Sequence, residues 1–168
     1  MALSSPFNFP DESGPIALSM PLMNERVQKL RTPKDCEVFA RNATKMGEHM
    51  LAREATRRAI ALRAASYGAT SDAERECLEA IYAYEEILFR KHGRRVRANR
   101  TWKVIRERGI LAAIEHVVDR PDGTAGFTAL EQVGLENFAF EAVILRHAQL
   151  FSESAVQRSR ERMGQLSE

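Results

Sequence analysis

Glycines that follow stretches of helical periodicity are the feature that most constrains how this chain folds. Between Thr32 and Gly93, apolar residues recur every three or four positions in three successive stretches, and Gly47, Gly68 and Gly93 close them. A glycine directly after such a stretch is typical of a helix C-terminus, because it adopts the left-handed backbone conformation without steric cost. The pattern therefore predicts three consecutive helices joined by short turns.

The starts of these helices are also marked. Thr32 precedes Pro33, an arrangement in which the threonine caps a helix and the proline takes its first position. Ser71 and Glu74 have the spacing of a capping box at the start of the third helix. We therefore expect an αα-hairpin over residues 33–67, followed by a long helix of about 20 residues.

Two shorter helices are predicted after the long one. Asn99 is positioned to cap a helix that ends at Gly109, and another helix follows up to Asp119. Pro121 and the two residues after it have the composition of a turn. The long helix and these two elements make up the middle part of the predicted domain, residues 71–120.

The C-terminal part, residues 124–166, is predicted to consist of short helices. One is stopped by Gly134, a second covers about residues 138–147, and Ser152 is positioned to cap the last. We expect the tail from Gln157 onward to fray at the surface, because arginines alternate there with other polar residues.

The predicted fold class is all-α, a compact bundle of about six to eight helices. No β-branched stretch bounded by glycine or proline alternates apolar and polar residues, so we expect no sheet. Residues 23–168 are predicted to form this single helical domain. Residues 1–22 are predicted to be an extended or flexible arm, because four prolines fall within the first 21 positions.

Composition excludes several classes of protein. No window of 18 apolar residues occurs, so we expect neither a membrane span nor a membrane partner. The start of the chain lacks the basic residues of a secretory signal. Cys36 and Cys77 are the only cysteines and have no metal-binding or redox-motif spacing, which favours a reducing compartment. We therefore expect a cytoplasmic protein without a metal or cofactor.

The charge of the chain is unevenly distributed. The 168 residues have a net charge of +2, but residues 90–108 contain nine basic residues and one acidic residue, Glu107. This basic segment has a net charge of +8, and the rest of the chain, with 16 basic and 22 acidic residues, has −6. So many like charges repel one another, and an anionic partner is a common reason for a protein to tolerate them.

The basic segment predicts a protein that binds the phosphate backbone of DNA or RNA. Guanidinium groups present paired donors that match phosphate oxygens, and a polyanion releases condensed counterions when they bind. We expect Trp102 to hold this segment to the bundle, and Glu86 to pair with Arg90 four residues later. The predicted contact residues are Arg90, Lys91, Arg94, Arg95, Arg97, Asn99, Arg100, Lys103 and Arg106.

Two other functions stay open. In the first, the protein is a helical interaction module: the hairpin or the N-terminal arm contacts a protein or a second copy of the chain, and the basic segment meets an acidic surface. In the second, it is a metal-dependent nuclease, which requires an acidic pair, Glu76 with Glu79 or Glu115 with Asp119, to hold a divalent ion beside the basic segment.

Enzymatic activity is the less favoured interpretation. The sequence contains no P-loop, no GxGxxG, no GxSxG and no HExxH pattern, and its four histidines occur singly. No catalytic residue is therefore assigned.

Overall fold

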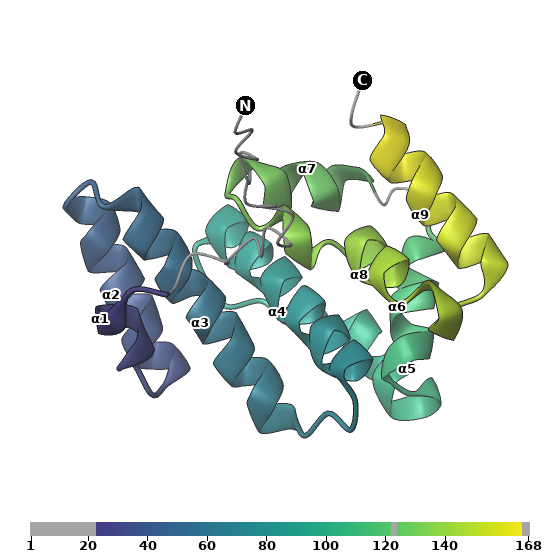
Figure 1. Cartoon of the computed structure of the whole chain (residues 1–168), viewed down its shortest axis with the longest axis horizontal. Coiled ribbons are helices and arrows are strands. Elements are labelled where there is room, and N and C mark those ends of the chain that lie inside the picture. The colour runs from purple at the N-terminus through teal and green to yellow at the C-terminus, as the bar shows by residue number, and fades with distance from the viewer. Residues whose placement is uncertain (1–22, 122–123, 166–168) are drawn as a thin grey trace, which may run out of the picture.

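Nine α-helices and two short 3₁₀ helices make up the part of the chain that the computed structural model describes, residues 23–121 and 124–165 (Figure 1). No strand occurs in that part, and the predicted all-α class is confirmed. The predicted arm, residues 1–22, lies outside the described residues. One helix, α1 (Glu25–Gln28), was not expected, because four residues are too few for periodicity to reveal.

The hairpin predicted from the glycine pattern consists of α2 (Pro33–Lys45) and α3 (His49–Tyr67). The Thr32 hydroxyl accepts a hydrogen bond from the backbone N–H of Asp35 at 3.1 Å, so the predicted cap is confirmed. Gly47 makes the turn with a φ of 76°. The two helices pack closely because α3 buries small side chains, among them those of Ala52, Ala55 and Ala59.

The long helix α4 (Asp72–His92) runs through the middle of the molecule, between the hairpin and the C-terminal helices (Figure 1). The Ser71 hydroxyl accepts a hydrogen bond from the N–H of Glu74 at 3.2 Å, and Gly93 ends the helix with a φ of 68°. Its inward face carries fully buried side chains, of which Leu78 and Ile81 are the largest. Burying each of these contributes about 1.5–3 kcal/mol.

The main apolar core lies between α4 and four later helices, α5 (Asn99–Arg108), α6 (Ile110–Val118), α8 (Phe140–Arg146) and α9 (Glu153–Gln165). Trp102 of α5 is only 3% exposed, which confirms the predicted anchor. A smaller cluster joins α3 and α4 to α7 (Thr124–Gln132) and to the residues that follow it.

Two predicted helix ends are wrong for the same reason, namely contacts between residues far apart in sequence. Asn99 does not cap α5: Ala98 occupies the cap position, and its N–H donates to the Glu85 carboxylate of α4 at 2.8 Å. The expected fraying after Gln157 does not occur within the described residues. There α9 continues to Gln165, because Arg162 is buried and forms an ion pair with Glu141 of α8 at 3.1 Å.

The helix predicted over residues 138–147 is interrupted. A 3₁₀ helix, η1 (Glu136–Phe138), comes first, and α8 begins after Ala139, whose extended backbone (φ −61°, ψ 143°) separates the two. A second 3₁₀ helix, η2 (Ala148–Leu150), precedes α9, whose predicted cap is confirmed because the Ser152 hydroxyl accepts from the N–H of Ala155. None of the described helices is both long enough and apolar enough to cross a bilayer.

Candidate nucleic-acid interface

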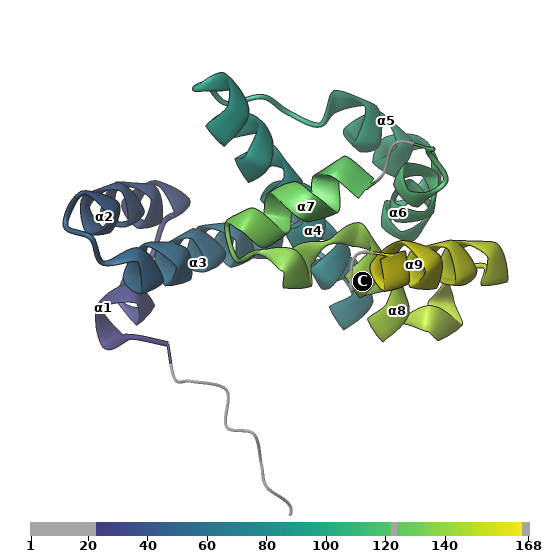
Figure 2. The ribbon, with the colours of Figure 1, turned by 90° about the horizontal axis from the view of Figure 1, so that it is seen from above.

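The basic segment follows one edge of the molecule. It starts in the last turn of α4, continues through the link of residues 93–98 and ends with α5, and Figure 2 shows these three parts in succession along the upper edge of the view. The side chains along this edge nevertheless differ in what they contact. Arginines at the end of α4 and in the link contact carboxylates or a ring, whereas α5 carries basic residues on its exposed face.

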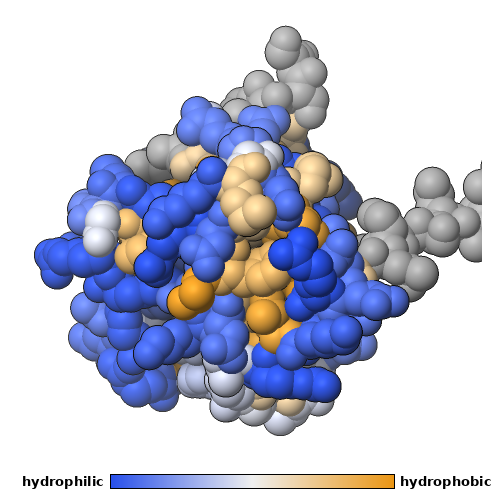
Figure 3. Space-filling view, turned by 90° about the vertical axis from the view of Figure 1, so that its left-hand side faces the viewer, coloured by the Kyte–Doolittle hydropathy of each residue, from blue (hydrophilic) through white to orange (hydrophobic). Residues whose placement is uncertain are grey.

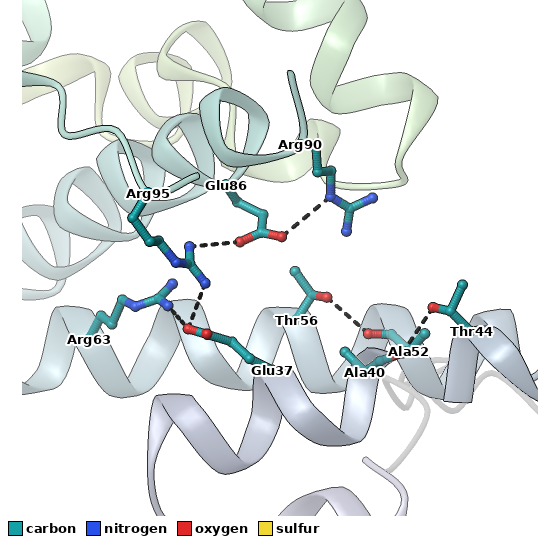
Figure 4. Close-up of polar contacts among 9 residues, drawn as sticks. All are labelled: Glu37, Ala40, Thr44, Ala52, Thr56, Arg63, Glu86, Arg90 and Arg95. Carbon is teal, nitrogen blue, oxygen red and sulfur yellow. Dashed lines mark hydrogen bonds and ion pairs between the residues drawn. The ribbon is translucent and has the colours of Figure 1, made fainter. Parts of the chain in front are cut away.

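Arg90 and Arg95 share one carboxylate. Glu86 contacts the Nε atom of Arg90 at 3.3 Å through one oxygen and an Nη atom of Arg95 at 3.1 Å through the other (Figure 4). The predicted pair of Glu86 with Arg90 is confirmed. Because Glu86 lies on the inward side of α4 and is only 9% exposed, this bridging carboxylate holds the link close to the body of the protein.

A second carboxylate continues the same network. The other Nη atom of Arg95 lies 2.6 Å from Glu37 of α2, and Glu37 also pairs with Arg63 of α3 (Figure 4). The result is an alternating chain of five charges that connects α3, α2, the link and α4, and both carboxylates in it contact two arginines. Burial, together with the nearby charge of Arg95, lowers the pKa of Arg63.

Arg97 takes a different partner. Its guanidinium lies over the ring of Trp102, 5.0 Å from the ring centroid, a distance typical of a cation–π contact. The indole N–H of Trp102 donates to Glu85 at 2.6 Å, and the rings of Tyr67 and Tyr82 each lie 5.4 Å from the tryptophan ring. The start of α5 is therefore fixed by one carboxylate and by an aromatic cluster.

The exposed face of α5 is organised differently. Arg100, Lys103 and Arg106 are spaced three residues apart and lie on one exposed side of the helix, while the opposite side buries Trp102 and Ile105. Within the described residues, the only ion pair of these three basic side chains is that of Lys103 with Glu107, at 3.9 Å, where both side chains are more than half exposed. Such a pair contributes about 0.3–0.5 kcal/mol.

The predicted contact residues therefore fall into two groups. Arg90, Arg95 and Arg97 are exposed but also contact carboxylates or a ring, which the sequence predicted for Arg90 and not for the other two. Their role as phosphate contacts stays a prediction. Lys91, Arg94, Asn99, Arg100, Lys103 and Arg106 are exposed. Arg108, which was not among the predicted contacts, is exposed as well.

The sequence reveals some of the contacts that these arginines make, but not all of them. Glu86 precedes Arg90 by four residues, a spacing that indicates an ion pair on a helix. Glu37, in contrast, reaches Arg95 only because the hairpin packs beside the end of α4, and no local pattern signals this contact.

The acidic pairs considered for a nuclease are engaged elsewhere. Glu76 contacts Arg146 at 2.7 Å, and Glu79 contacts Arg75 at 3.1 Å. Burial favours a higher pKa for Glu76, but the Arg146 and His147 contacts outweigh it and lower the pKa.

The second acidic pair is also occupied. Glu115 accepts a hydrogen bond from the N–H of Ser152, and Asp119 pairs with Arg158. Among the described residues, no three histidine, cysteine, aspartate or glutamate side chains gather as metal ligands would.

Comparison with protein-family models, with curated proteins and with solved structures found no match to this chain.

Proposed function

We propose that this protein binds the phosphate backbone of nucleic acid through the exposed face of α5, with Lys91 and Arg94 as additional contacts. The observation that carries the proposal is the stripe formed by Arg100, Lys103 and Arg106, three basic side chains that share one exposed side of a helix. Phosphate contacts of this kind give affinity and orientation without reading the base sequence.

The dimensions of the stripe suit a nucleic-acid strand. Six residues of helix separate Arg100 from Arg106, which corresponds to a rise of about 9 Å. One strand of B-form DNA advances by about 3.4 Å per phosphate along the duplex axis, so roughly three phosphates fall within this length. Three basic side chains can therefore each approach a different phosphate.

The stripe is also rigidly supported. Trp102 and Ile105 bury the opposite side of α5, and Glu85 holds the first turn through Trp102 and the backbone of Ala98. A surface that is already ordered loses less conformational entropy when it binds. This supports α5, rather than the link, as the contact surface.

The test is the salt dependence of binding to a labelled DNA duplex and to RNA of the same sequence, followed by fluorescence anisotropy. Six basic residues of the segment lie outside the Glu86 network and the Trp102 contact: the three of the stripe, with Lys91, Arg94 and Arg108 beside it. They predict a slope of log affinity against log salt concentration no steeper than about −5. Replacing Arg100, Lys103 and Arg106 by glutamine should make the slope shallower by roughly 3.

A charge-matched control is available on the first two helices and their flanks. Lys29, Lys34 and Lys45 are exposed, and none has an ion pair within the described residues. Replacing these three by glutamine removes the same net charge and should leave the slope unchanged. Affinity that does not respond to salt, or an equal effect of the two triple variants, would overturn the proposal.

A second candidate function, protein interaction, is favoured by exposed apolar side chains on the hairpin. Met46 and Met50, on either side of the turn, are 70% and 66% exposed, and Val38 of α2 is 44% exposed. Figure 3 shows apolar side chains among hydrophilic ones on the side of the molecule that carries α1 and α2. Exposed methionines are common on surfaces that adapt to partners.

Sedimentation velocity at high salt tests this alternative in its simplest form, self-association. High salt screens the basic segment, so an apolar contact persists while an electrostatic one weakens. A dimer that disappears when Met46 and Met50 are both replaced by glutamine would support it. A monomer at every concentration would exclude self-association through the hairpin.

A further inference from the structure

A cavity of about 510 Å³ lies between the hairpin, the end of α4 and the end of α7. Its volume is within the usual range of small-molecule sites, about 300–1,000 Å³. The charged side chains around it come from four segments: Glu37 and Arg41 of α2, Arg53 of α3, Glu86 and Arg90 of α4, and Arg95 of the link. The cavity is thus adjacent to the ion-pair network but separate from the exposed face of α5.

The charge on the cavity wall is positive. Four guanidinium groups face two carboxylates, a formal net charge of +2. Both carboxylates already contact arginines, and Arg95 uses both of its terminal nitrogens for them. The wall therefore has more guanidinium N–H donors than its two carboxylates can accept.

Three arginines supply these donors. Arg90 contacts Glu86 only through Nε, and Figure 4 shows its two terminal nitrogens turned away from that carboxylate, toward the space above α2 and α3. Arg41 and Arg53 have no ion pair within the described residues. A guanidinium whose terminal nitrogens are available presents the fork that binds two oxygens of one oxyanion.

The Arg53 guanidinium packs against the turn after α7. Gly134, which ends the turn after α7 with a φ of 69°, lies so close that a Cβ atom there would collide with the Arg53 guanidinium. Arg57, one turn further along α3, donates to the carbonyl of Gly134 at 2.8 Å. The turn after α7 therefore closes one end of the cavity and restricts where the Arg53 guanidinium can lie.

Four further polar side chains line the cavity, those of Thr44, His49, Thr56 and Gln132. The hydroxyls of Thr44 and Thr56 donate to the carbonyls of Ala40 and Ala52, at 2.9 and 3.0 Å (Figure 4). Only their acceptor lone pairs remain for a ligand. His49 and Gln132 also carry N–H donors, but only the guanidinium groups combine paired donors with a permanent positive charge, so they are the principal groups that would recognise an anion.

We infer that this cavity binds a small organic phosphate, a phosphomonoester whose phosphate group contacts Arg41, Arg53 and Arg90. Such a group carries a charge of about −1.5 to −2 at neutral pH, which balances the +2 of the wall, whereas one carboxylate balances only half of it. Phe89 and Val133, with alanines of α2 and α3, give the cavity an apolar part for the organic portion. This site goes beyond the proposed function and does not depend on it.

The test uses the full chain and three probes: inorganic phosphate, phenyl phosphate and benzoate. Isothermal titration calorimetry should show binding of phenyl phosphate, weaker binding of inorganic phosphate and the weakest binding of benzoate. Replacing Arg41 or Arg53 by glutamine should each weaken phenyl phosphate binding roughly tenfold, the size of one hydrogen-bonded ion pair. Because the Arg41 side chain is exposed and has no ion pair among the described residues, the Arg41→Gln variant should fold normally.

The control is Lys103→Gln on α5, which should reduce affinity for nucleic acid and leave phenyl phosphate binding unchanged. Equal affinity of the Arg41→Gln variant and the original chain for phenyl phosphate would overturn the inference. Equal affinity for benzoate and phenyl phosphate would also overturn it, because a dianion site distinguishes them. Failure of nucleic-acid binding alone would contradict the proposed function and leave this inference intact.

Discussion

The two halves of the basic segment have similar composition but different surroundings. In the half from Arg90 to Arg97, arginines contact Glu86, Glu37 or the Trp102 ring. In the half from Asn99 to Arg108, basic side chains extend from an exposed helix face on which Glu107 is the only carboxylate. The number of basic residues in a segment therefore does not give the charge available to a partner. That charge depends on which acidic residues the fold brings within reach.

The halves also differ in what they contribute to stability. Glu86 is almost fully buried, and its partner Arg95 also pairs with Glu37, so this network connects α4 to α2, which is far away in the chain. The exposed pair of Lys103 and Glu107 connects only successive turns of one helix. We therefore expect substitutions within the ion-pair network of Glu86 to change stability more than binding, and substitutions of the exposed basic residues of α5 to do the reverse.

The largest loss of stability is expected at Trp102, whose ring contacts Arg97 of the first half while its own helix forms the second. Trp102→Ala removes the aromatic anchor of α5 and leaves a cavity, which should lower the free energy of unfolding by about 3–5 kcal/mol. It should also remove the ring that Arg97 covers, so both halves lose a contact. Urea denaturation followed by circular dichroism measures the change. Tyr67→Phe, which keeps the partly exposed ring packed against Trp102, serves as the control and should cost less than about 1 kcal/mol.

A smaller loss of stability is expected for Glu86→Gln. This change keeps the shape of the side chain but leaves Arg90 and Arg95 without their shared negative charge. Breaking a fully buried pair costs about 3–5 kcal/mol, and because the two arginine side chains are 44% and 40% exposed, we expect about 1–3 kcal/mol. The matched change on α5, Glu107→Gln, should cost no more than about 0.5 kcal/mol. Equal costs in the same denaturation experiment would contradict the distinction between the halves.

The smallest effect is expected for Arg97→Gln. Loss of the cation–π contact with Trp102 should lower the free energy of unfolding by about 0.5–1 kcal/mol. Arg94 is exposed in the same link and has no ion pair within the described residues, so Arg94→Gln should stay within about 0.5 kcal/mol of the original chain. Thermal denaturation of the two variants in parallel resolves this difference, and a greater loss for Arg94→Gln would show that the contacts of the link are misassigned.

The correct sequence-based predictions rest on local contacts. Thr32, Ser71 and Gly93 act on backbone groups within a few residues of themselves, so the ends of α2 and α4 could be predicted from spacing alone. The predicted burial of Trp102 likewise follows from its position relative to Ile105 on one helix side.

The wrong predictions involve partners far apart in the sequence. Asn99 loses the cap position because Glu85 of a neighbouring helix accepts the N–H of Ala98, and the end of α9 is ordered by Glu141 of α8. The contact of Arg95 with Glu37 was not predicted, because Glu37 lies on the hairpin, far away in the sequence. The pair of Glu86 with Arg90 could therefore be found from charge spacing, whereas the contact of Arg95 with Glu37 depends on the packing of the helices.

The most direct test of the difference between the two halves of the basic segment compares two charge-matched double variants. One replaces Arg100 and Arg106 by glutamine, and the other replaces Arg90 and Arg95. The measurement is the slope of log affinity for a DNA duplex against log salt concentration, with circular dichroism confirming that each variant is folded. We predict that the first variant makes the slope shallower by about 2, and that the second changes it by less than about 0.5 while lowering the melting temperature. An equal change of slope in both variants, or a larger one in the second, would contradict the account.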